Sequence, residues 1–84
     1  MLSDEIMEKL VPHVKKMMPK QDWHNIGILF EKVYLLDYDE DHDAYVIGYW
    51  NQPNPLLAFD TRTYTFLGVV MQDFVEEHGE LIDG

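Results

Sequence analysis

The chain of 84 residues contains no cysteine and a single serine, Ser3. The lack of cysteine excludes disulfide bridges, thiolate zinc sites and a cysteine nucleophile, and it fits the cytoplasm, where we expect the protein to reside. A lone serine, without a GxSxG, GxGxxG or P-loop motif, offers little for nucleophilic catalysis or phosphate binding. We therefore expect no enzymatic activity and no cofactor.

No apolar run approaches the roughly 20 residues of a membrane-spanning helix. Residues 1–5 are acidic, whereas a signal peptide begins with a basic segment, so we expect neither a membrane anchor nor secretion. The length predicts one domain over residues 1–84. The hydrophobic content of 46% is that of a folded chain, despite a net charge of −10.

Positive charge is nearly missing from the second part of the chain. Residues 1–32 hold five lysines and five acids and are neutral, whereas residues 33–84 carry Arg62 against eleven acids and hold the whole net charge. Such a surface repels phosphate backbones and anionic membranes, and it attracts basic proteins. We expect a basic protein partner and no direct contact with nucleic acid or membrane.

Short runs of β-branched and aromatic residues between turn formers occupy residues 31–60 and continue at 64–67, which is typical of an antiparallel meander. Apolar residues at helical spacing precede this meander, at 2–18, and follow it, at 67–78. The sequence therefore predicts an α+β fold, in which three or four antiparallel strands pack against an N-terminal and a C-terminal helix. Residues 80–84 are expected to fray.

Single residues predict details of the N-terminal part. Ser3 is expected to cap the first helix, and Pro12 to kink or break it, because proline removes a backbone hydrogen bond in mid-helix. Residues 20–30 are ambiguous between helix and strand. We favour a helical turn at 22–26 and a strand from about Ile28.

The pairing of the first two strands can be argued from the residues. With a five-residue tip at 39–43, Tyr38 lies opposite Ala44. One face of the sheet then receives Tyr34, Leu36 and Val46, and the other receives Val33, Leu35 and Ile47. Both faces are apolar, unlike those of a half-exposed strand pair. Either helices cover both faces, or one face is left open for a partner.

The tip, residues 39–43, is too charged to be buried and must lie at an exposed turn. Aspartates at alternate positions from Asp37 onward resemble the start of an EF-hand calcium loop. However, the glycine and glutamate positions of that loop fall on His42 and Gly48. We therefore predict no metal site, and a divalent ion bound by the loop at 37–43 remains a lesser alternative.

Aromatic side chains gather in and beside the predicted sheet. Tyrosine and tryptophan are enriched at interfaces, because they bury much area and lose few torsions. We predict a partner-binding surface in which acidic side chains steer association and aromatic side chains anchor it. Its residues are Asp39, Glu40, Asp41, Asp43, Tyr45, Tyr49 and Trp50.

In size, acidity and layout of helices and strands, the chain resembles bacteriocin or toxin immunity proteins and phage-encoded inhibitors that mimic DNA. The expected function is that of a small acidic binding module, comparable to an immunity protein, an antitoxin or a DNA mimic. Its target would be a basic protein or a nucleic-acid enzyme, which it would inhibit. The alternative is a homodimeric accessory or structural protein, whose open sheet face pairs with a second copy.

Overall fold

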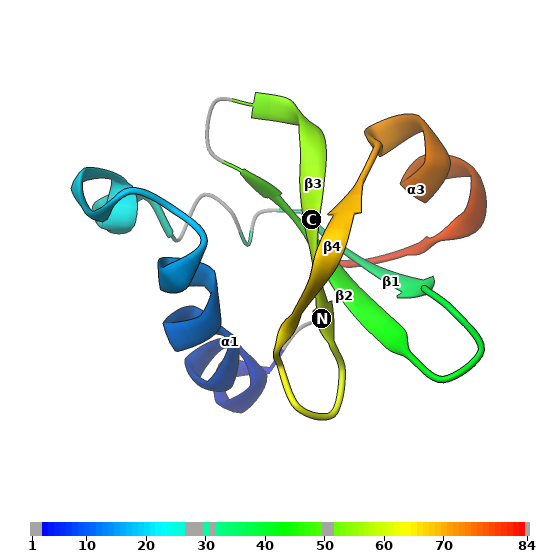
Figure 1. The fold of residues 1–84 in the computed structure, drawn as a ribbon, viewed down its shortest axis with the longest axis horizontal. Coiled ribbons are helices and arrows are strands. Elements are labelled where there is room, and N and C mark those ends of the chain that lie inside the picture. Colours follow the sequence, from blue (N-terminus) through cyan, green and yellow to red (C-terminus); the bar gives the residue numbers. More distant parts are fainter. Residues whose placement is uncertain (1–2, 27–29, 31, 50–51, 84) are drawn as a thin grey trace.

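The structure, a computed structural model, describes residues 3–26, 30, 32–49 and 52–83, with side chains for all of these except 25, 49, 52–54 and 83. Within these ranges the chain forms two α-helices and a five-stranded antiparallel sheet, which confirms the predicted α+β fold (Figure 1). In chain order the elements are α1 (Asp4–Lys16), the 3-10 helix η1 (Lys20–Asn25), β1 (Val33–Asp37), β2 (Asp43–Tyr49), β3 (Gln52–Asp60), β4 (Phe66–Val70), α3 (Gln72–His78) and β5 (Glu80–Asp83). Across the sheet the strand order is β4-β3-β2-β1-β5. Neither α-helix in the described part of the chain is long and apolar enough to cross a membrane.

Helix α1 forms where the apolar spacing predicts it. Ser3 caps it, since its hydroxyl accepts a hydrogen bond of 3.3 Å from an amide of the first turn. Leu10 and Val14 are fully buried and hold the helix on the sheet. Of the expected kink or break at Pro12, the break does not occur, because α1 continues through it. Pro12 and Glu8 are both exposed, so water can reach the Glu8 carbonyl that Pro12 leaves without a donor.

The segment between α1 and β1 agrees with the prediction only in part. The 3-10 helix η1 confirms a helical turn near the predicted 22–26. The strand expected from about residue 28 begins at Val33, while 27–29 lie outside the described residues. Phe30 lies in a turn and is buried in the core beneath α1. Its side chain therefore packs under α1, and Phe30 is not part of β1.

The register of β1 and β2 differs from the predicted register by two residues. Asp37 lies opposite Asp43, so the five-residue tip covers 38–42 instead of 39–43. A shift of two residues leaves every side chain on its original face, because side chains alternate with a period of two. The assignment of residues to the two faces is therefore confirmed, although their partners are different.

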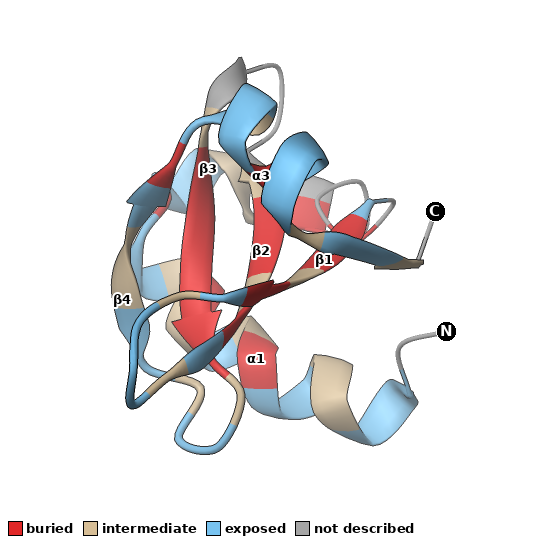
Figure 2. Cartoon of the chain, turned by 90° about the vertical axis from the view of Figure 1, so that its right-hand side faces the viewer, coloured by how far each residue is buried: buried red, intermediate tan, exposed pale blue. Residues whose placement is uncertain are grey.

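Helices cover both apolar faces of the sheet, with α1 on the left and α3 on the right in Figure 1. The core under α1, here called the α1 core, contains Leu10, Val14, Met18, Ile26, Phe30, Val33, Ile47, Leu57 and Phe59. The α3 core, on the other face, contains Tyr34, Leu36, Ala44, Val46, Leu56, Ala58, Val70 and Val75. Figure 2 shows β2 and β3 buried along much of their length, whereas α3 is exposed over most of its surface.

The C-terminal part of the chain differs most from the prediction. Residues 66–70 form β4, so the last helix is shorter than the helical spacing of 67–78 predicts. The expected fraying of residues 80–84 is wrong for the described 80–83, because they form β5 and pair with β1. Without β5, β1 would present the backbone groups of an unpaired edge. This pairing raises the strand count from the expected three or four to five.

Strand β3 begins among turn-forming residues. Strand β3 begins at Gln52 and includes Pro53 and Pro55, which have no amide to donate to a ladder. The register of β2 and β3 shifts between Ile47 and Tyr49, opposite this part of β3. The prolines thus lie where regular pairing is interrupted.

Candidate binding surface

Hydrogen bonds around Asp39 close the β1–β2 tip. The His42 carbonyl accepts the amides of Tyr38 and Asp39 at 3.0 and 3.2 Å, and the Asp39 carboxylate accepts the Asp41 amide at 2.8 Å. Asp39, Glu40 and Asp41 are exposed. The tip therefore presents its acids to solvent in a defined turn, as the charge of this segment predicts.

Two aspartates at the base of the tip lie directly opposite each other. Asp37 and Asp43 are paired across β1 and β2, and both are exposed. Like charges at directly opposite positions destabilise an antiparallel pair by roughly 0.2–1 kcal/mol. Neither carboxylate forms an ion pair with a described residue. A cationic group supplied from outside would relieve this repulsion.

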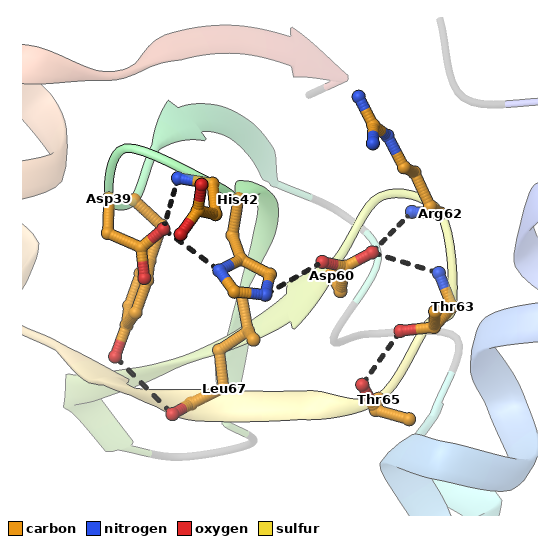
Figure 3. Close-up of polar contacts among 9 residues, drawn as sticks. Asp39, His42, Asp60, Arg62, Thr63, Thr65 and Leu67 are labelled. Carbon is orange, nitrogen blue, oxygen red and sulfur yellow. Dashed lines mark hydrogen bonds and ion pairs between the residues drawn. The ribbon is translucent and has the colours of Figure 1, made fainter.

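His42 connects the β1–β2 tip to the β3–β4 turn (Figure 3). Its Nδ1 lies 2.8 Å from Oδ1 of Asp39, and its Nε2 lies 3.8 Å from Oδ2 of Asp60. The hydrogen bond to Asp39 is the main cause that raises the pKa of His42 above its usual 6.5, and the charge of Asp60 adds to it. The same hydrogen bond lowers the pKa of Asp39. The imidazole thus links two turns that are distant in sequence.

Asp60 organises the β3–β4 turn and is the buried charged residue of the described chain. Its Oδ1 accepts the amides of Arg62 and Thr63 at 2.7 and 2.9 Å (Figure 3). These two amides lower the pKa of Asp60. Tyr64 follows with a φ of 62°, a left-handed conformation that is strained for a bulky side chain. The Asp60 turn therefore also imposes local backbone strain, which its hydrogen bonds offset.

An apolar groove of about 350 Å³ opens beside the tip, on the α3 side of the sheet. Its lining residues are Leu36, Tyr38, Val69, Val70, Met71 and Phe74. Val69, Met71 and Phe74 are exposed by 57%, 55% and 50%, so three large apolar residues of one groove are open to solvent. Asp73 precedes Phe74 in α3, and Asp39 follows Tyr38 at the tip. An exposed acidic residue is therefore next in the chain to a lining residue at each of these two points.

Tyr38 extends across the edge strand β4. Its hydroxyl donates a hydrogen bond of 3.4 Å to the Leu67 carbonyl. A methyl group at Gly68 would overlap that hydroxyl, so the lack of a side chain at Gly68 allows Tyr38 to reach this position. The wall of the groove thus depends on a contact between residues 30 positions apart in sequence.

The structure brings the predicted acidic residues together at the tip but does not join all predicted aromatic anchors to them. Tyr45 is half-buried and packs against the α1 core. Burial raises the pKa of its hydroxyl, with a smaller contribution from Tyr64. The side chain of Tyr49 and all of Trp50 lie outside the described residues, so their contribution to a binding surface stays a prediction.

The exposed apolar side chains that line the groove were missed from the sequence. Helical spacing places Met71 and Phe74 on one longer helix, and core filling is a commoner use of methionine than lining a groove. One available signal was the complete lack of charge between Arg62 and Asp73, which is rare on an exposed strand. The groove and the tip together form the candidate binding surface of this chain.

Among the described residues, no three histidine or carboxylate side chains converge as ligands for a metal ion. At the tip, Oδ1 of Asp39 contacts both Nδ1 of His42 and the Asp41 amide. Comparison with protein-family models, with curated proteins and with solved structures finds no match to this chain. Its function is therefore argued from the surface alone.

Proposed function

We propose that this chain is a non-enzymatic acidic module that binds a basic protein and inhibits it, as immunity proteins, antitoxins and DNA mimics do. The observation that carries the proposal is the exposed set of acids on the β1–β2 hairpin, in which Asp37 and Asp43 face each other without a cation. This arrangement is unfavourable in the free protein and becomes favourable next to a basic surface.

The charge distribution supports the same partner chemistry. Residues 33–84 hold the net charge of −10, and Arg62 is their one lysine or arginine. A surface of one sign accelerates the encounter with an oppositely charged protein and disfavours partners of like charge. We expect the tip acids Asp39, Glu40, Asp41 and Asp43 to steer the encounter. Tyr45, Tyr49 and Trp50 remain the proposed anchors.

Neutralising part of the tip tests this proposal. The variant Glu40→Gln/Asp43→Asn removes two charges and leaves the contacts of Asp39 and His42 in place. Glu5→Gln/Glu8→Gln on α1 makes the same change in net charge away from the tip. Proteins that the immobilised chain retains would be identified by mass spectrometry and purified, and their association rates and inhibition by the chain measured.

We expect the association rate to fall at least about tenfold between roughly 50 and 500 mM salt. The tip variant should slow association at low salt much more than the α1 variant does. A rate that ignores salt, or equal effects of the two variants, would contradict the role of the tip. A partner that binds but keeps full activity would contradict inhibition.

A further inference from the structure

Strand β4 is an uncharged edge strand, and a bulge at Leu67 interrupts only its first part. The strand order places β4 and β5 at the two edges of the sheet. Natural edge strands are usually short, charged, bulged or covered, because their free amides and carbonyls attract other strands. β5 has four residues and carries Glu80 and Asp83, whereas β4, Phe66–Val70, carries neither charge nor proline.

The register of β4 defines which part of this edge is regular. Ala58 pairs with Gly68 and Phe59 with Phe66, so Leu67 is the extra residue of a bulge. The Leu67 carbonyl already accepts the Tyr38 hydroxyl. The regular edge next to the groove therefore runs from Gly68 to Val70 and reaches the groove residue Met71.

Exposed apolar side chains lie on both faces of this edge. Val69 is a groove residue, but it pairs with Leu57, so the register directs its side chain to the face of the α1 core; it is 57% exposed. Met71 and Phe74 line the groove on the other face. A strand added alongside β4 would place alternate side chains on the two faces and would cover both sets.

The charge around the groove determines which strand fits. The exposed Asp39 and Asp73 are next in the chain to the lining residues Tyr38 and Phe74, and the segment 33–84 that builds the groove has a net charge of −10. Two copies of the chain paired through β4 would bring two such segments together, and like charges oppose that contact. A segment with lysine or arginine next to its apolar residues would be attracted instead.

We propose that the β4 edge and the adjoining groove bind an extended basic segment of the partner by strand addition. The segment pairs its backbone with residues 68–70, places one large apolar side chain against Met71 and Phe74, and directs flanking cations toward Asp39 and Asp73. This inference rests on the proposed function, since it gives the acidic module a docking site and its partner a recognisable segment.

The probe for this site is a synthetic peptide, Lys-Ile-Lys-Val-Lys-Ile-Lys, titrated into the full chain labelled with ¹⁵N. A second peptide of the same sequence carries N-methyl groups on its five central amides. It keeps the charge and the side chains, but its methylated central residues cannot donate backbone hydrogen bonds to β4. We expect the first peptide to shift the amide resonances of residues 68–71, and the methylated peptide to bind about tenfold more weakly or worse.

Two variants, in which the replaced side chains are equally exposed, distinguish binding in the groove from nonspecific hydrophobic binding. Phe74→Ala removes a groove side chain that is 50% exposed, and Leu81→Ala removes a side chain of equal exposure from the opposite edge, β5. We expect Phe74→Ala to raise the Kd of the peptide about tenfold. Leu81→Ala should change it less than about twofold, because β5 is not part of the site.

The outcomes of the titration distinguish this inference from the proposed function. Shifts confined to residues 39–43, or equal binding of the methylated peptide, would overturn strand addition and leave the acidic module intact. No binding of the basic peptide anywhere would count against both. If light scattering shows a dimer at micromolar concentration and dilution shifts residues 68–71, a second copy occupies the edge and the inference is wrong.

Discussion

Replacing Gly68 with alanine tests whether Tyr38 shapes the groove by crossing the edge strand. A methyl group at Gly68 overlaps the Tyr38 hydroxyl oxygen, whereas the ring carbon that bears this oxygen is 3.5 Å away, an ordinary contact distance. When Gly68→Ala is introduced into the otherwise wild-type chain, Tyr38 must shift and lose its hydrogen bond to the Leu67 carbonyl. In a Tyr38→Phe background no shift is needed, because the oxygen is absent.

Three contributions set the expected change in the free energy of unfolding. Loss of a long hydrogen bond costs about 0.5–1 kcal/mol, and displacement of a packed ring costs about 1 kcal/mol. Alanine in place of glycine stabilises the folded state by about 0.5 kcal/mol, because it reduces the conformational entropy of the unfolded chain. Gly68→Ala should therefore destabilise the wild-type chain by about 1–1.5 kcal/mol and stabilise the Tyr38→Phe variant by about 0.5 kcal/mol.

Urea denaturation of the four proteins measures this coupling as a double-mutant cycle. The expected interaction energy is about 1.5–2 kcal/mol, well above the roughly 0.3–0.5 kcal/mol seen for independent sites. A thermal melt should show a shift of about 4–8 °C for each kcal/mol in a chain of this size. The same effect of Gly68→Ala in both backgrounds would show that Tyr38 does not lie across β4.

Two further predictions concern the connections between distant segments. Because the pKa of His42 is raised in the folded protein, its stabilising effect is complete below the usual pKa of 6.5 and is lost as pH rises through the higher pKa of the folded state. His42→Asn should therefore lower the midpoint of thermal unfolding more at about pH 5.5 than at about pH 8.5. The pKa values of Asp39 and Asp60 are lowered in the folded protein, so these two carboxylates stabilise it above the usual pKa of 3.8, and this stabilisation should disappear as pH falls below that value. An effect of His42→Asn that does not depend on pH would contradict the link between the two turns. Truncation after Gly79 removes β5 and should destabilise the chain by about 2 kcal/mol or more in urea, because β1 loses its outer hydrogen bonds, whereas a frayed tail would cost less than about 0.5 kcal/mol.

Periodicity and capping were sufficient to predict the layers of this fold. Helix α1 follows from apolar spacing and from Ser3, and the two faces of the sheet follow from alternation in β1 and β2. The register was missed because tips at 38–42 and 39–43 have equal length and give the same faces. Only the hydrogen bonds that the His42 carbonyl accepts distinguish them.

The C-terminal elements were missed because their local patterns fit two structures. Leu67, Val70, Met71 and Phe74 recur at helical spacing, yet the first two lie in β4. A strand of four residues such as β5 is too short to show a period. Pairing with β1, a contact over more than forty residues, decides its conformation.

In the candidate site, too, features that depend on local sequence could be predicted, and features that depend on contacts between distant residues could not. The exposure of the tip acids follows from their charge, which the sequence states directly. The link from His42 to Asp60 and the contact of Tyr38 with β4 join separate hairpins, so no local pattern contains them. The groove exists because of such contacts and was therefore visible only in the structure.

The unequal helices explain why the exposed apolar surface lies where it does. Helix α1 has 13 residues and covers its face with the help of η1, whereas α3 has seven residues and buries Val75 alone. Met71 and Phe74 are left half-exposed beside an uncharged strand. The helix on this side also carries Asp73, Glu76 and Glu77 and no lysine or arginine. The face with the incomplete core is thus also an acidic face, so a basic strand that fits the edge would complete the core and neutralise the charge in the same step.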